Sequence, residues 1–231
     1  MQSSMGYILR TRPYSEASVI VDLFTKDSGR ITCMTRPAKL RGKVQKGHLQ
    51  AFRLLQLHWQ GRTELSRLTQ TDERFRHRIP PKNLLFGLYL NELLLKLVQT
   101  HAALDQLFTI YQHTLQLLCD TEMPMVVVMQ FELGLLNDLG HSPNLWQEDG
   151  AGENITPEAS YGYGVNIGLY LTDASASNHN SIPISGDLLI AMRQPETMSL
   201  QHYYELRRFL DDIWMRIVRK PFNSRKLLRF D

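Results

Sequence analysis

Residues 6–36 read GYILRTRPYSEASVIVDLFTKDSGRITCMTR, and this stretch decides the fold of the first part of the chain. Its β-branched and apolar runs at 6–11, 17–25 and 30–36 alternate in part between apolar and polar residues, as strands do. The connection Lys26–Gly29 contains Asp, Ser and Gly, which tolerate the backbone dihedrals of a hairpin turn. We therefore expect three consecutive strands here, with turn residues at 12–16 between the first two.

Two further strands are expected downstream, at 50–59 and 63–71, on either side of a turn at Gly61. Five short strands within about seventy residues fit a small closed or partly open barrel. The aromatic residues Phe52 and Trp59 lie in a leucine-rich strand, so packing in the barrel core is the favoured role for both.

Helices dominate after the break at Pro80–Pro81, and Asn83 suits an N-cap. The apolar periodicity predicts helices at 84–98, at 102–118, from Pro124 to Gly140 and at 199–218. The first of these is apolar almost all round, which predicts a central, buried helix. Residues 142–195 are rich in Gly, Asn, Ser and Asp, and 161–171 suggests one or two strands in a loop-rich lobe.

The net charge of +3 conceals a strong asymmetry along the sequence. Residues 1–82 contain 16 Lys/Arg and 6 Asp/Glu, residues 83–196 contain 2 and 13, and residues 197–231 contain 8 and 4. The basic ends favour a polyanionic partner, whereas a solvated charged surface without a partner is the plain alternative. The scattered carboxylates of the acidic middle are expected to lie on solvated faces.

The basic charge is concentrated between Ser28 and Thr63, where eight cations occur without one Asp or Glu. Five of them lie in 36–46 (RPAKLRGKVQK), which the strand pattern places in a long loop. Mobile cations on an accessible loop are what backbone phosphates require. Tyr14 in the first loop could stack on an unpaired base. A second basic cluster follows the last helix, where Arg225 and Lys226 lie too far beyond its end to serve the helix dipole alone.

Catalytic motifs are absent from the sequence: it has no GxxxxGK[ST], no GxSxG and no HExxH. The eight histidines are scattered, and the two cysteines, Cys33 and Cys119, form neither a CxxC pair nor a disulfide framework. We expect a non-enzymatic protein without a metal or other cofactor. Neither a signal peptide nor an apolar run of roughly 20 residues is present, so a cytoplasmic, nucleoid-associated protein is the simplest expectation.

Several segments together resemble the RecO family of bacterial recombination mediators. They are residues 6–31, KGHLQAFRLLQLHWQGRTEL (46–65), GLYLNELL (87–94), FELGLLNDLGH (131–141) and KPFNSRKLL (220–228). None is a catalytic signature, and the specificity lies in their order and spacing over nearly the whole chain.

The resemblance implies an α+β protein with an oligonucleotide-binding (OB) barrel over 1–80. A helical domain over 81–231 would follow, with an inserted lobe at 142–195. It further implies binding of single- and double-stranded DNA, annealing of complementary strands, action with RecR, and help for the recombinase RecA on DNA coated by single-strand-binding protein. The DNA surface would comprise Arg12, Tyr14, Arg30, Arg36, Lys39, Arg41, Lys43, Lys46 and Arg62, together with Arg225 and Lys226.

Two departures from the family's pattern bear on these expectations. Many relatives hold zinc with four cysteines in the inserted lobe, whereas 142–195 contains none, so packing alone is expected to support it. Close relatives also tend to carry Arg just before the phenylalanine of the third helix, where this chain has Met129 and Gln130. For the acidic tail of single-strand-binding protein, the candidate contacts are therefore Lys96, Phe131 and Leu135.

Two other functions fit parts of the sequence, and a third is a distant alternative. An RNA-binding or ribosome-associated barrel protein would use the same phosphate contacts. A protein-interaction scaffold would use the apolar helical middle as its docking surface. Metal-dependent hydrolysis would need clustered carboxylates, which the sequence does not display.

Overall fold

The structure, a computed structural model, describes residues 1–37, 44, 46–61, 65–102, 104–172, 181–218 and 222–224. The chain forms two compact units, Met1–Phe131 with Phe222–Asp231, and Glu132–Pro221, which we call the first and second unit. The first unit combines the barrel with the helices that follow it. The compact units therefore do not coincide with the boundary at residue 80 that the sequence indicates.

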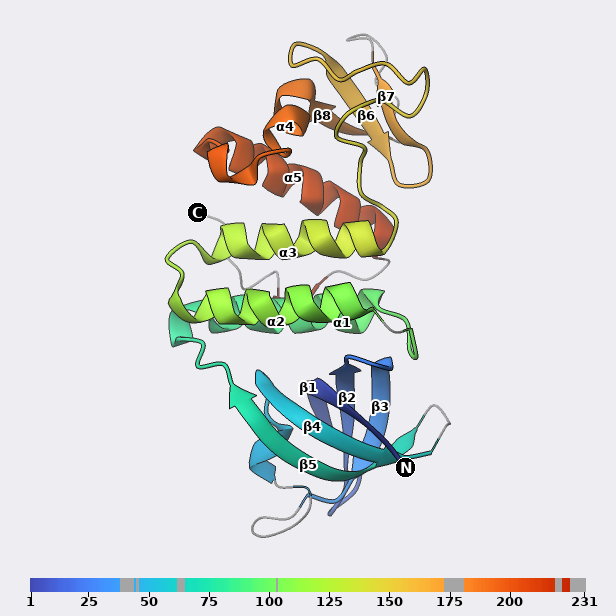
Figure 1. Ribbon diagram of the computed structural model, residues 1–231, viewed down its shortest axis with the longest axis vertical. Coiled ribbons are helices and arrows are strands. Elements are labelled where there is room, and N and C mark those ends of the chain that lie inside the picture. Colours follow the sequence, from blue (N-terminus) through green and yellow to red (C-terminus); the bar gives the residue numbers. More distant parts are fainter. Residues whose placement is uncertain are drawn as a thin grey trace. The chain divides into compact units, whose positions relative to one another are not determined.

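The first unit begins with a closed five-stranded barrel (Figure 1). Its strands are β1 (Gln2–Pro13), β2 (Val19–Thr25), β3 (Gly29–Thr35), β4 (Arg53–Gln60) and β5 (Ser66–Arg76). Their order is β1-β2-β3-β5-β4, and every pair is antiparallel except β3 with β5. The expected barrel and its five strands are confirmed. The prediction of a turn at Arg12 and Pro13 is wrong, because β1 continues through both residues while pairing with β2.

Gly6 allows the barrel to close. It is the residue of β1 that pairs with both neighbours, since it lies opposite Thr25 of β2 and Leu55 of β4. A Cβ atom at this position would lie 2.6 Å from Cδ1 of Leu57 and 2.9 Å from the carbonyl oxygen of Phe24. Only glycine fits there, as is usual where a strand bends sharply at a barrel corner.

Alternate residues of the strands fill the barrel interior. Val21, Leu23, Ile31 and Cys33 are at most 1% exposed and pack with other apolar residues of all five strands. Phe52 and Trp59 are 7% and 2% exposed, which confirms that they belong to the core and not to a stacking surface.

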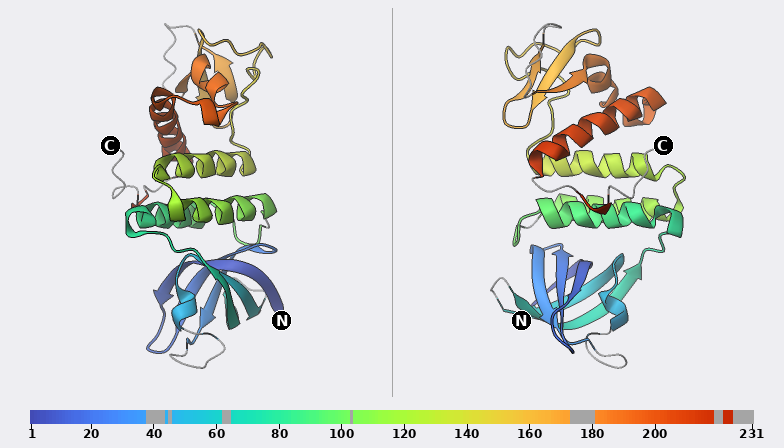
Figure 2. Two further views of the ribbon diagram at one scale, coloured as in Figure 1. Left: turned by 60° about the vertical axis from the view of Figure 1, so that its left-hand side comes forward. Right: turned by 180° about the vertical axis from the view of Figure 1, so that it is seen from behind.

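Two helices of the first unit, α1 (Leu84–Leu97) and α2 (Asp105–Asp120), lie together across one end of the barrel (Figures 1 and 2). Tyr7 and Phe24 of the barrel pack against Phe108 and Tyr111 of α2, with ring centroids 5.2 to 5.9 Å apart. Buried Asn91 of α1 links the two layers: its Nδ2 donates to the carbonyl oxygen of Leu9, and its Oδ1 accepts from the Tyr111 hydroxyl. Aromatic packing and a satisfied polar link thus hold the helices to the barrel.

Two expectations for α1 need correction. The helix is not buried all round, because Leu84, Leu85 and Leu88 are 40%, 37% and 41% exposed. Asn83 occupies the N-cap position, but its side chain does not cap α1. It donates instead to the carbonyl oxygens of Leu118 and Thr121, each at 3.0 Å, and so satisfies groups at the end of α2.

The second unit contains a three-stranded sheet and the last two helices (Figures 1 and 2). The sheet order is β7-β6-β8, with β6 at Ser160–Gly164, β7 at Gly168–Leu171 and β8 at Ile182–Ser185. Helix α4 (Gly186–Ala191) and helix α5 (Leu200–Ile217) pack against β8. The strands expected within 161–171 and the final helix are confirmed.

Helix α3 (Pro124–Asp138) runs from the first unit into the second, and its bounds agree with the helix predicted from Pro124 to Gly140. The expectation that the carboxylates of the helical middle are solvated is wrong for Glu132, which is 0% exposed. Within the second unit Glu132 accepts hydrogen bonds from Arg207 and from Nε1 of Trp214. A buried cation therefore takes the place of water around this carboxylate.

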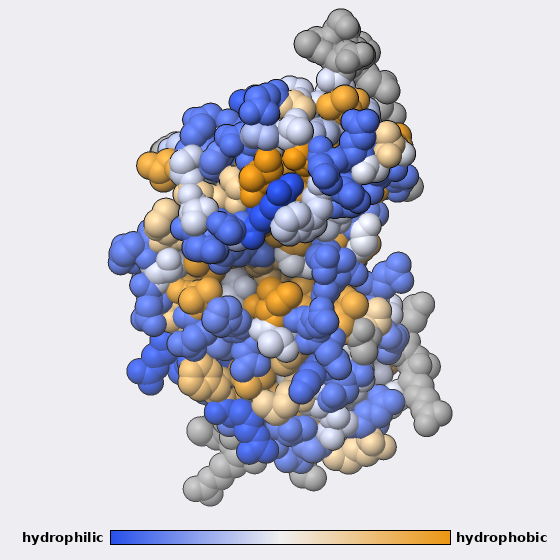
Figure 3. Space-filling model, turned by 45° about the horizontal axis from the view of Figure 1, so that its top comes forward, coloured by the Kyte–Doolittle hydropathy of each residue, from blue (hydrophilic) through white to orange (hydrophobic). Residues whose placement is uncertain are grey.

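Figure 3 shows a face on which hydrophilic residues predominate and apolar residues form small groups. Among the described residues, no helix combines the length and the apolar character needed to cross a membrane.

Candidate nucleic-acid interface

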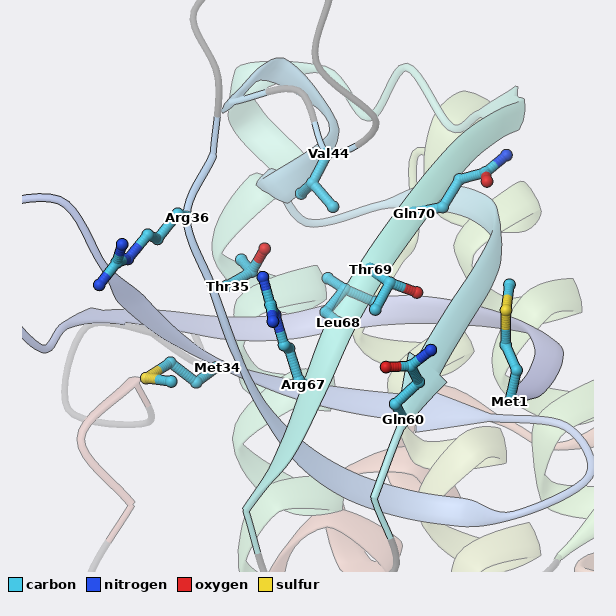
Figure 4. Close-up of a pocket in the computed structure, with 10 residues that line it drawn as sticks. All are labelled: Met1, Met34, Thr35, Arg36, Val44, Gln60, Arg67, Leu68, Thr69 and Gln70. Carbon is cyan, nitrogen blue, oxygen red and sulfur yellow. The ribbon is translucent and has the colours of Figure 1, made fainter.

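A groove of about 670 Å³ lies on the barrel beside the parallel pair of β3 and β5 (Figure 4). It is lined by Met1, Met34, Thr35, Arg36, Val44, Gln60, Arg67, Leu68, Thr69 and Gln70. The described lining residues include two arginines, four uncharged polar residues and no carboxylate. Such a surface favours a negatively charged ligand that also offers hydrogen-bonding and apolar groups.

The strand register places this groove on a wider basic face. Residues directly opposite each other in a sheet project from the same side, and here Arg12 lies opposite Ile20, Ile20 opposite Met34, and Met34 opposite Arg67. Gln60 of β4 continues the row, because it lies opposite Arg67. The row follows the outer surface of the barrel, since the neighbouring residues Val21 and Cys33 point into the core. Arg12 and Arg67 are thus separated by three strand spacings, about 14 Å.

The next row of the same face is organised by Asp22, whose side chain is only 2% exposed. Its carboxylate accepts from Nε of Arg10 at 2.9 Å and from the Thr32 hydroxyl at 3.0 Å, and Nη2 of Arg12 lies 3.6 Å away. One carboxylate thus orders two arginines, and both arginine side chains stay 48% exposed. The face keeps a net positive charge around this fixed centre.

Arg30 lies on β3 near the helical end of this face. Its Nε donates to the carbonyl oxygen of Val98 at 2.9 Å. The pKa of Arg30 is lowered, mainly by burial. The charge of Asp22 opposes this shift and the charge of Arg10 adds to it. This bond to the chain after α1 gives Arg30 a structural role beside any contact with a ligand.

Tyr14 and Arg36 lie at the opposite end of the face, in and beside the β1–β2 connection. The backbone N–H of Tyr14 donates to the carbonyl oxygen of Ser18, and Nε of Arg36 donates to the Ser18 hydroxyl at 3.3 Å. The Tyr14 side chain is 59% exposed. Backbone hydrogen bonds therefore fix the loop while the ring remains available for stacking.

The remaining expected contacts are only partly described. Lys46 is exposed at the start of the short 3₁₀ helix η1 (Lys46–Leu49). Six further candidates lie outside the described residues: Lys39, Arg41, Lys43, Arg62, Arg225 and Lys226. Of the described residues within 36–46, Arg36 and Val44 line the groove.

The sequence analysis did not predict three residues that line the groove, Arg67, Gln60 and Gln70. Arg67 lies between the buried residues Ser66 and Leu68. That alternation could have indicated an outward arginine, whereas the density of cations in 36–46 drew attention to the loop. The proximity of β3 and β5 could not be read from local pattern, because their pairing joins residues more than thirty positions apart.

The residues expected to hold an acidic peptide tail have other partners. In the first unit, Nζ of Lys96 lies 3.0 Å from Oε1 of Glu92 and 4.6 Å from the centroid of the Phe222 ring. Phe131 and Leu135 are both 0% exposed. Their observed roles are an ion pair and core packing, and of the three only the Lys96 side chain is partly exposed, at 22%.

The described residues of the inserted lobe contain no group of three or more metal-binding side chains. Carboxylates tie the lobe together instead. Oδ2 of Asp149 accepts from the backbone N–H of Leu169 at 2.7 Å, and Glu148 accepts from the backbone N–H of Ala151. The expectation that the lobe relies on packing alone therefore needs correction, because side chain–backbone hydrogen bonds contribute as well.

A five-stranded OB-type barrel with a basic groove, followed by helices and a small sheet, places the chain in the class of OB-fold proteins. The family model "Recombination protein O N terminal" matches residues 1–73, and "Recombination protein O C terminal" matches residues 81–226. The chain belongs to the RecO family.

Individual relatives agree over almost the full length. The chain is 32% identical over 225 residues to the DNA repair protein RecO of Aliivibrio salmonicida, which covers 96% of this chain and 91% of the relative. It is 31% identical over 225 residues to that of Vibrio atlanticus, with 96% and 89% covered. It is 30% identical over 234 residues to that of Nitrosospira multiformis, with 99% and 95% covered. These matches support a role in recombination repair of DNA.

Proposed function

We propose that the barrel binds single-stranded DNA along the outer face of β1, β2, β3 and β5, with the groove beside Arg36 and Arg67 as its centre. The observation that carries this proposal is the cross-strand row from Arg12 to Arg67, which ends in a groove whose described lining has no carboxylate. Cations spaced along one face match a chain of phosphates, and the exposed Tyr14 offers a surface for a base.

In this proposal, Lys39, Arg41, Lys43, Lys46 and Arg62 add phosphate contacts from the loops. Arg225 and Lys226 add contacts from the end of the chain. The protein also binds double-stranded DNA and anneals complementary strands. Together with RecR it helps RecA to load onto DNA coated by single-strand-binding protein, whose acidic tail is a further partner. These activities depend on binding and positioning of DNA, without a catalytic step or a cofactor. The protein acts in the cytoplasm, at the nucleoid.

The proposal is tested by fluorescence anisotropy of a labelled oligo(dT) titrated with the wild-type chain and with the double variant Arg36→Ala/Arg67→Ala. A hydrogen bond to a charged group contributes roughly 1.5–3 kcal/mol, so the variant should bind about tenfold more weakly or worse. Arg208→Ala is the matched control, because Arg208 is an exposed arginine of the second unit and lies outside the barrel.

Equal affinity of the double variant and the wild type would contradict the placement of the site. The same titration with a matched oligo(U) strand addresses RNA binding. The relatives named DNA repair protein favour DNA, and a strong preference for the RNA strand would favour the ribosome-associated alternative.

A further inference from the structure

A second groove, of about 650 Å³, lies in the first unit where the end of β5 meets the end of α2. β5 and the residues after it contribute Phe75, Arg76, His77 and Arg78, and α2 contributes Cys119 and Asp120. The residues considered above for DNA binding do not line it. The groove is therefore a separate feature of the unit.

An exposed aromatic ring stands at this groove. Phe75 is 48% exposed, although it belongs to a strand of the barrel. The β4–β5 register shifts between Leu54 and Leu55, which lie opposite Phe75 and Glu73, so Arg74 is the extra residue of a β-bulge. Bulges redirect side chains and are common beside functional sites. The bulge here leaves Phe75 on the surface between arginines.

His77 lines the same groove and has an unsatisfied, buried ring nitrogen. The residue is 5% exposed, its backbone N–H donates to the carbonyl oxygen of Phe52, and its Nε2 lies 3.0 Å from the Tyr7 hydroxyl. Its Nδ1 is enclosed and has no hydrogen-bond partner in the part of the chain that the structure describes. Buried polar atoms are rarely left unpaired, so a water molecule or a ligand atom is expected beside Nδ1.

The protonation states around His77 define what that ligand atom can be. Burial lowers the pKa of His77 to about 4, so the ring is neutral at pH 7, and burial raises the pKa of Tyr7, so its hydroxyl keeps its proton. A Tyr7 hydroxyl that donates to Nε2 leaves the ring proton on Nδ1. The complementary ligand atom is then an acceptor, such as a base carbonyl or a phosphate oxygen.

The surrounding charge is positive. Glu73 forms ion pairs with Arg53 and Arg76, and Asp120 stands at the end of α2. Arg74 and Arg78 are exposed beside them. Two arginines, Arg76 and Arg78, and two carboxylates, Glu73 and Asp120, line the groove, and the exposed Arg74 beside it gives this part of the surface a net positive charge.

We propose that this groove is a second binding site for single-stranded DNA, in which an unpaired base stacks on Phe75 and its backbone phosphates contact Arg74 and Arg78. Stacking on an exposed ring is tolerant of sequence, and arginines beside the ring add phosphate contacts and cation–π attraction.

The site lies far from the first groove along the same strand. Arg67 and Arg76 stand near the two ends of β5, nine residues apart, which corresponds to a path of roughly 30 Å. Two separated sites on one unit allow two strands to be held at once, which is what annealing needs. This inference rests on the proposed function, and it assigns the second DNA strand of the annealing reaction to this groove.

The test uses the full-length chain and two labelled complementary oligodeoxynucleotides. The double variant Phe75→Leu/Arg78→Gln keeps an apolar side chain at position 75 and removes the ring and one cation. Tyr204→Leu/Arg208→Gln in the second unit is the matched control, since Tyr204 is 60% exposed. Circular dichroism and thermal melting confirm that each variant is folded.

We expect the Phe75 variant to anneal the strands at least fivefold more slowly, with less than a twofold change in affinity for a first oligo(dT). The control variant should anneal as the wild type does, and Phe75→Trp should retain the rate. Photo-crosslinking of an oligo(dT) with one 5-iodouracil should label the peptide containing Phe75.

If the Phe75 variant binds DNA and anneals strands as the wild type does, and no cross-link to Phe75 forms, this inference alone is overturned. The inference is also overturned if a short acidic peptide with a terminal aromatic residue blocks the photo-cross-link to Phe75 and unlabelled oligo(dT) does not. Absence of DNA binding by the wild-type chain would instead overturn the proposed function together with the inference.

Discussion

Arg207 of α5 and Glu132 of α3 form a buried ion pair in the second unit. Nη1 of Arg207 lies 2.5 Å from Oε2 of Glu132, and the two side chains are 8% and 0% exposed. Asp211 accepts from Nε of Arg207 at 2.7 Å, and Trp214 donates to Oε1 of Glu132 at 2.8 Å. The polar atoms of the pair are thus satisfied inside the unit.

Removal of one member of this pair should destabilise the second unit strongly. Arg207→Met leaves the Glu132 carboxylate without its cation in a dry environment, and we expect a loss of about 3–5 kcal/mol in the free energy of unfolding. Urea denaturation followed by tryptophan fluorescence measures it. The double variant Arg207→Met/Glu132→Leu, which buries no lone charge, should recover part of the loss. A single variant as stable as the wild type would show that the pair is not buried as described.

Glu92 should make stability depend on acid pH. Burial opposes its ionisation, but hydrogen bonds from the Ser224 hydroxyl, from the backbone N–H groups of Asn223 and Ser224, and from Lys96 outweigh burial and lower its pKa to about 2. Because the pKa of Glu92 is depressed in the folded state, its carboxylate stabilises that state at pH values above 4.5, the ordinary pKa of a glutamate. This contribution is lost as the pH falls from there toward 2.

The measurement compares the wild type with Glu92→Gln by chemical denaturation between pH 7 and pH 2. The variant should be less stable at pH 7, and the difference should shrink as the pH falls through the range from 4.5 to 2. A difference that stays constant across this range would contradict the carboxylate's role in holding Asn223 and Ser224.

Tyr14→Ala should weaken binding without unfolding the barrel. The ring is 59% exposed and the hydrogen bond to Ser18 uses the backbone, so stability should change by no more than about 0.5 kcal/mol. Loss of one stacked base costs roughly 1–3 kcal/mol, so affinity for oligo(dT) should fall by about fivefold to about 160-fold. Anisotropy titration measures it, and Tyr14→Phe serves as the control that keeps the ring. Unchanged affinity of Tyr14→Ala would exclude stacking at this position.

The inserted lobe should depend on Asp149. Its carboxylate accepts from the backbone N–H of Leu169, and it packs close to Gly168, whose φ is +87°. Asp149→Ala should destabilise the second unit by about 1 kcal/mol, the usual net value of one hydrogen bond. Thermal melting checks this, and Asp149→Asn should lose less because an amide oxygen still accepts. Equal melting of Asp149→Ala and wild type would show that packing alone supports the lobe.

Local pattern predicted the elements of this protein well, and it predicted long-range pairing poorly. The strands around residues 6–36 follow from alternation and turn residues, which are properties of neighbouring positions. Asn83 was expected to cap its own helix, but the ends of α1 and α2 meet, so it bonds to carbonyl groups of α2. The pairing of Glu132 with Arg207 joins positions 75 residues apart, and no local spacing signals it.

The candidate site shows the same division. Arg12, Tyr14 and Arg36 were expected from charge and loop position. The register places Arg12 on the outer face, Arg36 lines the groove, and the exposed Tyr14 lies in the adjoining β1–β2 connection. Arg67 joins them only because β3 and β5 pair in parallel to close the barrel. Asp22, a carboxylate inside a strand, orders Arg10 and Arg12, and the charge balance of the sequence gives no sign of that role.

The salt dependence of oligo(dT) binding tests the proposed interface most directly, because it reports how many phosphates the barrel contacts. Affinity for single strands falls with salt at a log–log slope of about −0.7 per phosphate contact, so Arg36→Ala/Arg67→Ala should flatten the slope by about 1.4 and lower affinity at low salt. A double variant with the slope and affinity of the wild type would contradict binding at this groove.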